Sequence, residues 1–188
     1  MKKVHAPVGV VYSGVGGVSV GRGMGRLLPH EETVYVADQA HMPYGSRSLD
    51  EGRDYCEGVV RFLLGHGAKA VVVACNSASA AALHHLRSVF PGIPFVGMEP
   101  ALKPAVERTR RGVVGVLATR ATFQGELFSA LAAQYENEAR VLTRVGWGLA
   151  QAVESGALES AETDGLLREC LAPLMGAGMD PSLTPIRR

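Results

Sequence analysis

Short runs of β-branched and other apolar residues recur along the chain, and each ends in a cluster of small or polar residues. Five of these runs are predicted to be strands: residues 9–12, 33–37, 70–74, 93–97 and 112–117. The runs are continuously apolar and do not alternate with polar residues, which is typical of parallel strands whose two faces are both covered by helices. The pattern therefore predicts an open, doubly wound α/β architecture with parallel sheets.

Helix-length segments separate the strands. Residues 49–64 carry apolar side chains at helical spacing, and residues 77–90 and 123–135 are rich in Ala and Leu with few helix breakers. A new series of strands and helices follows the fourth strand. We therefore expect two similar α/β domains, residues 1–97 and residues 98–188.

A weak internal repeat supports two related halves. Residues 63–69 (LLGHGAK) and 174–180 (LMGAGMD) share one pattern of Leu, an apolar residue and two spaced glycines. A valine-rich strand follows the first copy, but Pro181 and Pro185 follow the second, and proline removes a hydrogen-bond donor that a central strand needs. We therefore expect the second domain, and the chain's return to the first, to be incomplete at the C-terminus.

Composition and charge exclude several classes of function. The 188 residues carry a formal net charge of +1 without a long basic block, which disfavours a nucleic-acid partner. No apolar stretch approaches the roughly 20 residues that span a bilayer, and the first apolar run is too short for a signal peptide. Three widely separated cysteines suit reduced thiols. A cytoplasmic protein is the expectation.

Cys75 is the most informative single residue. It stands between a predicted buried strand and an Ala-rich helix, where backbone N–H groups and the helix dipole favour a thiolate. Such a cysteine can abstract a proton or act as a nucleophile, although a small buried core residue is the alternative. Asn76 and Ser77 favour function, since donors beside the thiol could hold a carboxylate or an enolate-like oxygen. Cys56 and Cys170 lie in apolar helical patterns and are expected in the core.

Two further turns could meet a ligand. The glycine-rich segment 13–17 (SGVGG) follows the first strand, where backbone N–H groups can bind a small anion, but it fits neither common nucleotide-binding pattern. A plain structural turn is equally consistent with it. The segment 43–46 (PYGS) follows the second strand and is either a plain turn or a ligand contact through Tyr44. The six histidines show no metal-binding spacing and are expected to be solvated; His41 alone is placed to approach a pocket.

Four motifs together resemble the glutamate racemases, within the wider aspartate/glutamate racemase family. They are residues 13–17 (SGVGG), 43–46 (PYGS), 75–78 (CNSA) and 118–122 (ATRAT), and their order and spacing also agree. The resemblance runs from about Val8 to Asp180. It implies two similar α/β domains with an active site between them, and a cofactor-independent racemase that supplies D-glutamate for peptidoglycan.

The mechanism that the resemblance implies is proton transfer between two bases. One cysteine thiolate removes the α-proton from one face of the substrate, and a second cysteine returns a proton to the other face. Cys75 matches the first base. The positions matching the family's substrate-binding residues are Ser13, Tyr44, Gly45, Asn76, Ser77, Thr119 and Thr122. The implied partner is a small molecule, glutamate, with no cofactor, metal, nucleic acid or membrane; a homodimer is one oligomeric state consistent with the resemblance.

The sequence departs from the family at two places. The family usually has Asp immediately before the Ser-Gly of the first motif, where this chain has Tyr12. The family's second cysteine lies in a Gly-Cys-Thr-His segment that this sequence does not contain, and the position equivalent to Cys75 in the internal repeat is Ile186. Reduced activity is therefore one expectation.

Two alternative functions remain open. A non-catalytic amino-acid-binding or interaction protein on a racemase-like scaffold is consistent with Tyr12 and with the absent second cysteine. An enzyme of the same superfamily that acts on aspartate, a hydantoin or maleate is the other, although those enzymes also use paired cysteines.

Overall fold

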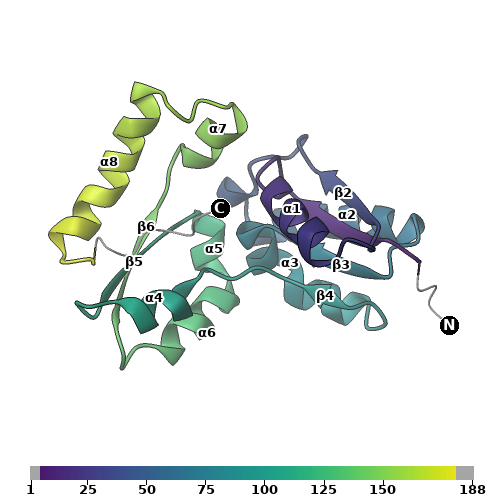
Figure 1. The fold of residues 1–188 in the computed structure, drawn as a ribbon, viewed down its shortest axis with the longest axis horizontal. Helices are drawn as coiled ribbons and strands as arrows, with labels where there is room; N and C mark the ends of the chain where they lie inside the picture. Colours follow the sequence, from purple (N-terminus) through teal and green to yellow (C-terminus); the bar gives the residue numbers. More distant parts are fainter. Residues whose placement is uncertain (1–4, 181–188) are drawn as a thin grey trace. The chain divides into compact units, whose positions relative to one another are not determined.

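The computed structural model describes residues 5–180 of the chain (Figure 1). The backbone contacts divide the chain into two compact units, Met1–Met98 and Glu99–Arg188. Each unit has its own parallel sheet and is described by itself below. None of the helices in the described part of the chain is long and apolar enough to cross a membrane.

The first unit is built on a four-stranded parallel sheet in the order β2-β1-β3-β4. Its strands are β1 (Val8–Tyr12), β2 (Thr33–Ala37), β3 (Ala70–Val73) and β4 (Phe95–Val96). The two central strands, β1 and β3, hold most of the buried valines, whereas β2 at the sheet edge is only half-buried. The parallel α/β prediction is confirmed, although β4 is shorter than the apolar run that predicted it.

Helices connect these strands. They are α1 (Val18–Leu27), the short 3₁₀ helix η1 (Tyr44–Ser46), α2 (Leu49–Gly65) and α3 (Asn76–Val89). Helices α2 and α3 pack against each other and against the central strands. Helix α2 begins with a capping box in which the Ser48 side chain accepts from the Glu51 amide and the Glu51 carboxylate accepts from the Ser48 amide.

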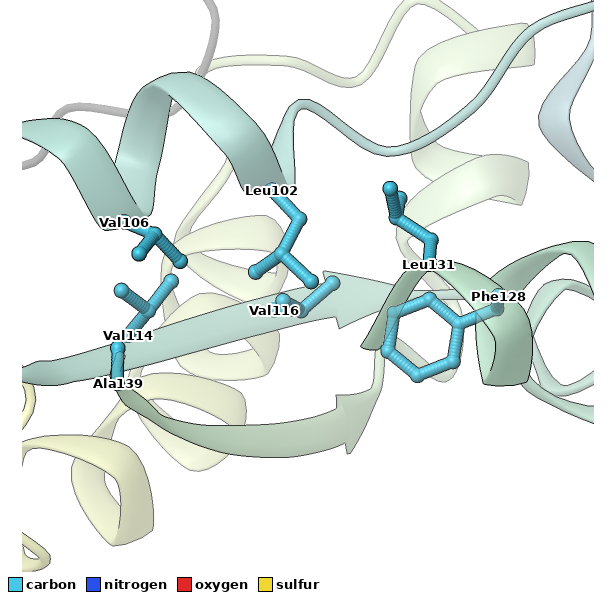
Figure 2. Close-up of a cluster of buried hydrophobic side chains, with 7 residues drawn as sticks. All are labelled: Leu102, Val106, Val114, Val116, Phe128, Leu131 and Ala139. Carbon is cyan, nitrogen blue, oxygen red and sulfur yellow. The ribbon is translucent and has the colours of Figure 1, made fainter. Parts of the chain in front are cut away.

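The second unit contains a parallel pair of strands, β5 (Val113–Ala118) and β6 (Arg140–Val145). Its helices are α4 (Leu102–Arg108), α5 (Arg120–Gln124), α6 (Glu126–Gln134), α7 (Leu149–Glu154) and α8 (Ala161–Gly176). Figure 2 shows the core cluster that joins α4, β5 and α6: Leu102, Val106, Val114, Val116, Phe128, Leu131 and Ala139.

Several elements were not expected from the sequence, among them β6, α1, α4 and α7, and one prediction was wrong in detail. Strand β6 was missed because Arg140, Thr143 and Arg144 interrupt its apolar pattern. Helix α1 was missed because glycines recur along it, and glycine disfavours helices. The predicted helix at 123–135 is divided at Gly125 into α5 and α6.

The internal repeat corresponds to a repeated local structure. Gly67 and Gly178 follow the ends of α2 and α8 with positive φ angles of 82° and 89°. In both copies the helix ends in a Schellman motif: Ala68 N–H donates to Leu63 O, and Met179 N–H donates to Leu174 O, both at 3.1 Å. The strand expected to be absent after the second copy lies outside the described residues.

We predict that Leu102→Ala destabilises the second unit by about 2–5 kcal/mol, since Leu102 is 1% exposed at the centre of the cluster in Figure 2. Leu158→Ala is the matched control, because Leu158 is 59% exposed. Urea unfolding of both variants measures the difference. Equal losses in the two variants would contradict this description of the core.

Candidate functional site

The first unit places three chain segments together at the carboxyl edge of its sheet. The strand order changes direction between β1 and β3, and ligands of open α/β folds bind at such switch points. Backbone hydrogen bonds to β1 continue past the ends of β3 and β2. Ala74 N–H donates to Val11 O and Asp38 N–H donates to Tyr12 O, each at 2.9 Å. The residues that directly follow β1, β2 and β3 therefore lie at the same edge of the sheet.

Cys75 and Ser13 meet at this switch point. The Ser13 Oγ lies 3.9 Å from the Cys75 Sγ, and both residues are buried. Cys75 is the N-cap of α3, and its sulfur accepts a hydrogen bond from the Ala78 N–H at 3.5 Å. A side chain at this position faces the positive end of the helix dipole, which stabilises negative charge. The arrangement suits a proton-accepting sulfur.

Asn76 and Ser77 begin α3 next to this sulfur. The Asn76 Oδ1 is buried and has no hydrogen-bond partner, alone among the side-chain oxygens and nitrogens of residues 5–180. An unsatisfied buried acceptor costs about 1–3 kcal/mol, so such an atom marks a place where a ligand's donor is accommodated. Ser77 is buried one residue further along the helix.

Tyr44 and Gly45 belong to η1, which packs against α3. The Tyr44 hydroxyl donates to Asp38 Oδ2 at 2.6 Å, so its hydrogen is already engaged within the chain. Burial and this hydrogen bond raise the pKa of Tyr44 well above its usual value, which keeps the hydroxyl protonated. His41 Nδ1 lies 2.9 Å from both oxygens of the same carboxylate. The sequence did not single out Asp38, although an acid directly after a strand was a usable signal.

The glycine-rich segment is shaped around Tyr12. A Cβ added at Gly17 would lie 2.7 Å from Tyr12 Cγ, and one added at Gly16 would meet the Tyr12 hydroxyl group. The Tyr35 hydroxyl donates to Gly14 O at 2.6 Å. None of the glycines in this segment has a positive φ angle. Close packing with Tyr12 therefore explains Gly16 and Gly17, and a left-handed turn does not.

Thr119 and Thr122 lie together in the second unit. Thr119 is the N-cap of α5; its Oγ1 accepts from the Thr122 N–H and lies 2.9 Å from the Thr122 Oγ1. The sequence motif at 118–122 thus forms a local hydroxyl pair, and its role toward a substrate stays a prediction.

The other candidates lie elsewhere. Cys56 and Cys170 are buried core residues, as predicted, and burial raises the pKa of the Cys56 thiol. Within residues 5–180, no three His, Cys, Asp or Glu side chains form a group that could hold a metal ion. His85 is partly exposed, and its Nε2 lies 2.6 Å from Glu57 Oε2, so the side chain links α3 to α2.

Fold and site together define an α/β protein with a buried cysteine at a helix N-terminus. Residues 17–181 match the model of the Asp/Glu/hydantoin racemase family. The chain belongs to this family. A glutamate racemase of Roseiflexus sp. is 52% identical over 174 residues, which are 93% of this chain and 64% of the relative. The chain thus spans less than two thirds of that relative's length.

Solved structures agree with this assignment. Glutamate racemase isoform RacE1 of Bacillus anthracis has 33% sequence identity and a TM-score of 0.83, over 94% of this chain and 66% of the other. Glutamate racemase of Escherichia coli, solved in complex with L-glutamate and an activator, has 32% identity and a TM-score of 0.78, over 89% of this chain and 64% of the other.

We predict that Gly17→Ala destabilises the first unit by about 1–3 kcal/mol, because the new methyl group overlaps the Tyr12 ring. Gly21→Ala is the control: a Cβ there meets nothing within 4 Å, and Ala in a helix is favoured over Gly by about 0.5–1 kcal/mol. Urea unfolding is the measurement. The penalty should disappear in a Tyr12→Ala background, and its persistence there would show that another contact causes it.

The hydrogen-bonded contact between Glu57 of α2 and His85 of α3 gives a pH prediction. Hydrogen bonds from His85 and Arg61 lower the pKa of Glu57, so its stabilising contribution is present above the unfolded-state pKa of about 4.3 and is lost as pH falls through the folded-state value. We expect wild-type stability to exceed that of Glu57→Gln at pH 7 and to converge with it in acid. Urea unfolding from pH 3 to pH 7 measures this, with Glu169→Gln, an exposed residue of α8, as the control. A constant difference across that range would contradict the assignment.

Proposed function

We propose that this chain carries one half of a glutamate racemase reaction, with Cys75 as the base that exchanges the α-proton on one face of the substrate. The observation that carries the proposal is the sulfur of Cys75 at the N-terminus of α3, beside the unpartnered Asn76 Oδ1. These two atoms supply a proton acceptor and an acceptor for an ammonium group. An α-amino acid presents both the acidic C–H bond and the ammonium donor.

The chemistry follows from these positions. The Cys75 thiolate takes the α-proton, the C–H electron pair remains on the α-carbon conjugated with the carboxylate, and the resulting thiol later returns a proton. The Ala78 N–H donates to the sulfur, and the Ser13 Oγ lies 3.9 Å from it, so both groups contact the atom that takes the proton. No cofactor is part of this proposal, so stabilisation of the carbanion falls to donors fixed in the protein.

Glutamate is chosen as the substrate because the relatives support it. The relatives from Roseiflexus sp., Bacillus anthracis and Escherichia coli are named glutamate racemases, and the last was solved with L-glutamate bound. Ser13, Tyr44, Gly45 and Ser77, with Thr119 and Thr122, are the further substrate-binding positions that we propose. Supply of D-glutamate for peptidoglycan in the cytoplasm belongs to the same proposal.

Racemisation requires a second proton donor on the opposite face of the carbanion, which in the proposed mechanism is a second cysteine. The 188-residue sequence offers only Cys56 and Cys170 besides Cys75, and both are buried in the core. We therefore propose that the 188-residue polypeptide carries the Cys75 half of the exchange, in which one face of one enantiomer loses and regains its hydrogen.

We predict that the 188-residue protein in deuterated buffer introduces deuterium at the α-carbon of one glutamate enantiomer with retained configuration, and that Cys75→Ala abolishes this uptake. The thiol exchanges its proton with solvent before returning it, so label enters without inversion. Proton NMR of the α-hydrogen measures uptake, and chiral chromatography measures configuration. Cys170→Ala, a buried cysteine of the second unit, is the matched control and should keep the uptake.

Other results would change the assignment. Uptake that persists in Cys75→Ala contradicts Cys75 as the base. Inversion of both enantiomers contradicts the restriction to one face. Glutamate binding by calorimetry that survives Cys75→Ala, with no label uptake by the wild-type protein, favours the amino-acid-binding alternative, and the same assays with aspartate test the substrate.

A further inference from the structure

The end of β2 carries a cluster of side chains that the proposed proton transfer does not use. Asp38 follows the strand directly, and its side chain is only 12% exposed. Its carboxylate accepts from Tyr44 Oη at 2.6 Å through Oδ2, and both of its oxygens lie 2.9 Å from His41 Nδ1. One carboxylate therefore joins His41, which precedes η1, to Tyr44, the first residue of η1.

His41, one of the two partners of Asp38, is held in place by further contacts. The His41 ring stacks on the Tyr55 ring of α2, with centroids 3.9 Å apart and an interplanar angle of 16°. The Arg47 Nε donates to His41 O at 3.4 Å. A histidine with hydrogen on Nδ1 donates to Asp38 whether the ring is neutral or charged, so the His41–Asp38 contact does not depend on ring charge. The carboxylate is thereby held from a second direction.

Tyr44, the other partner of Asp38, connects the cluster to the candidate base, Cys75. Tyr44 is 2% exposed and is the first residue of η1, and η1 packs against α3. Helix α3 begins directly after its N-cap, Cys75. A shift of Tyr44 therefore moves the turn that lies against the helix carrying the sulfur. A charge-assisted hydrogen bond as short as 2.6 Å is a strong restraint on that shift.

We propose that Asp38 is a positioning residue of the Cys75 site: its carboxylate, held by His41, fixes Tyr44 and so keeps η1 packed against α3, the helix whose N-cap is Cys75. The proposal rests on the proposed role of Cys75 as the base. Asp38 acts through Tyr44, and its own contact with substrate is not part of the proposal.

The experiment compares Asp38→Asn with wild type in two readouts. The first is the rate at which iodoacetamide alkylates Cys75, resolved by peptide mass spectrometry, since Cys75 is 5% exposed and reacts when its surroundings open. The second is deuterium uptake into glutamate, with kcat and KM measured separately. Asp54→Asn makes the same chemical change on the exposed face of α2 and is the matched control.

We expect Asp38→Asn to speed Cys75 alkylation about tenfold, because losing a charge-assisted hydrogen bond raises the open population by that order. Asp54→Asn should stay within about twofold of wild type. Tyr44→Phe, which removes only the hydroxyl, should reproduce the effect, and the double variant should add nothing further because both changes break one link. Uptake should fall mainly through kcat, since the base is misplaced.

Alkylation of Asp38→Asn at the wild-type rate overturns the proposal, and so do additive effects in the double variant. If Asp38→Asn does not fold, the alkylation rate of Tyr44→Phe decides by the same criterion. A wild-type protein that takes up no deuterium with glutamate refutes the proposed function and leaves the alkylation result to judge the positioning role alone.

Discussion

The pairing of β1 with β3 is the constraint on which the candidate site depends. These strands run parallel with Val11 opposite Val73, and this register brings Ser13 and Cys75 to 3.9 Å, although 62 residues separate them in the chain. A slip of one residue would turn the valines of one strand from one face of the sheet to the other. The buried valines that fix the register of β1 and β3 therefore also fix the position of the Cys75 sulfur. The packing of the core thus determines the geometry of the candidate site.

Aromatic side chains also determine the conformation of the segment that follows β1 at the same edge of the sheet. Tyr12 ends β1, and its ring occupies the space that side chains at positions 16 and 17 would need. Tyr35 on the neighbouring strand holds the carbonyl of Gly14. The segment after β1 is thus folded onto the sheet by two tyrosines. A tyrosine where the family usually has an acid is compatible with this fold because glycines leave room for it.

The sequence predicted those parts of the fold that depend on uninterrupted local patterns. The valine runs of β1 and β3 and the position of Cys75 at a helix start are recognisable because neighbouring residues agree with one another. Strand β6 was missed because its arginines and threonine hide a partly buried strand in a polar pattern. The Asp38 cluster could not be predicted, because spacing alone does not show that one carboxylate binds both His41 and Tyr44. Such bridges arise from tertiary geometry.

The repeated helix ending shows how one local device sets the start of a strand. After Gly67, Lys69 N–H donates to Pro7 O beside the start of β1; after Gly178, Asp180 N–H donates to Val113 O at the start of β5. In both units the chain therefore leaves a long helix through a left-handed glycine and comes alongside the first strand of its own sheet. In the first unit this entry fixes where β3 begins and, because β3 is four residues long, where it ends. The position of Cys75 is therefore determined from the glycine turn before β3 as well as from the helix that follows it.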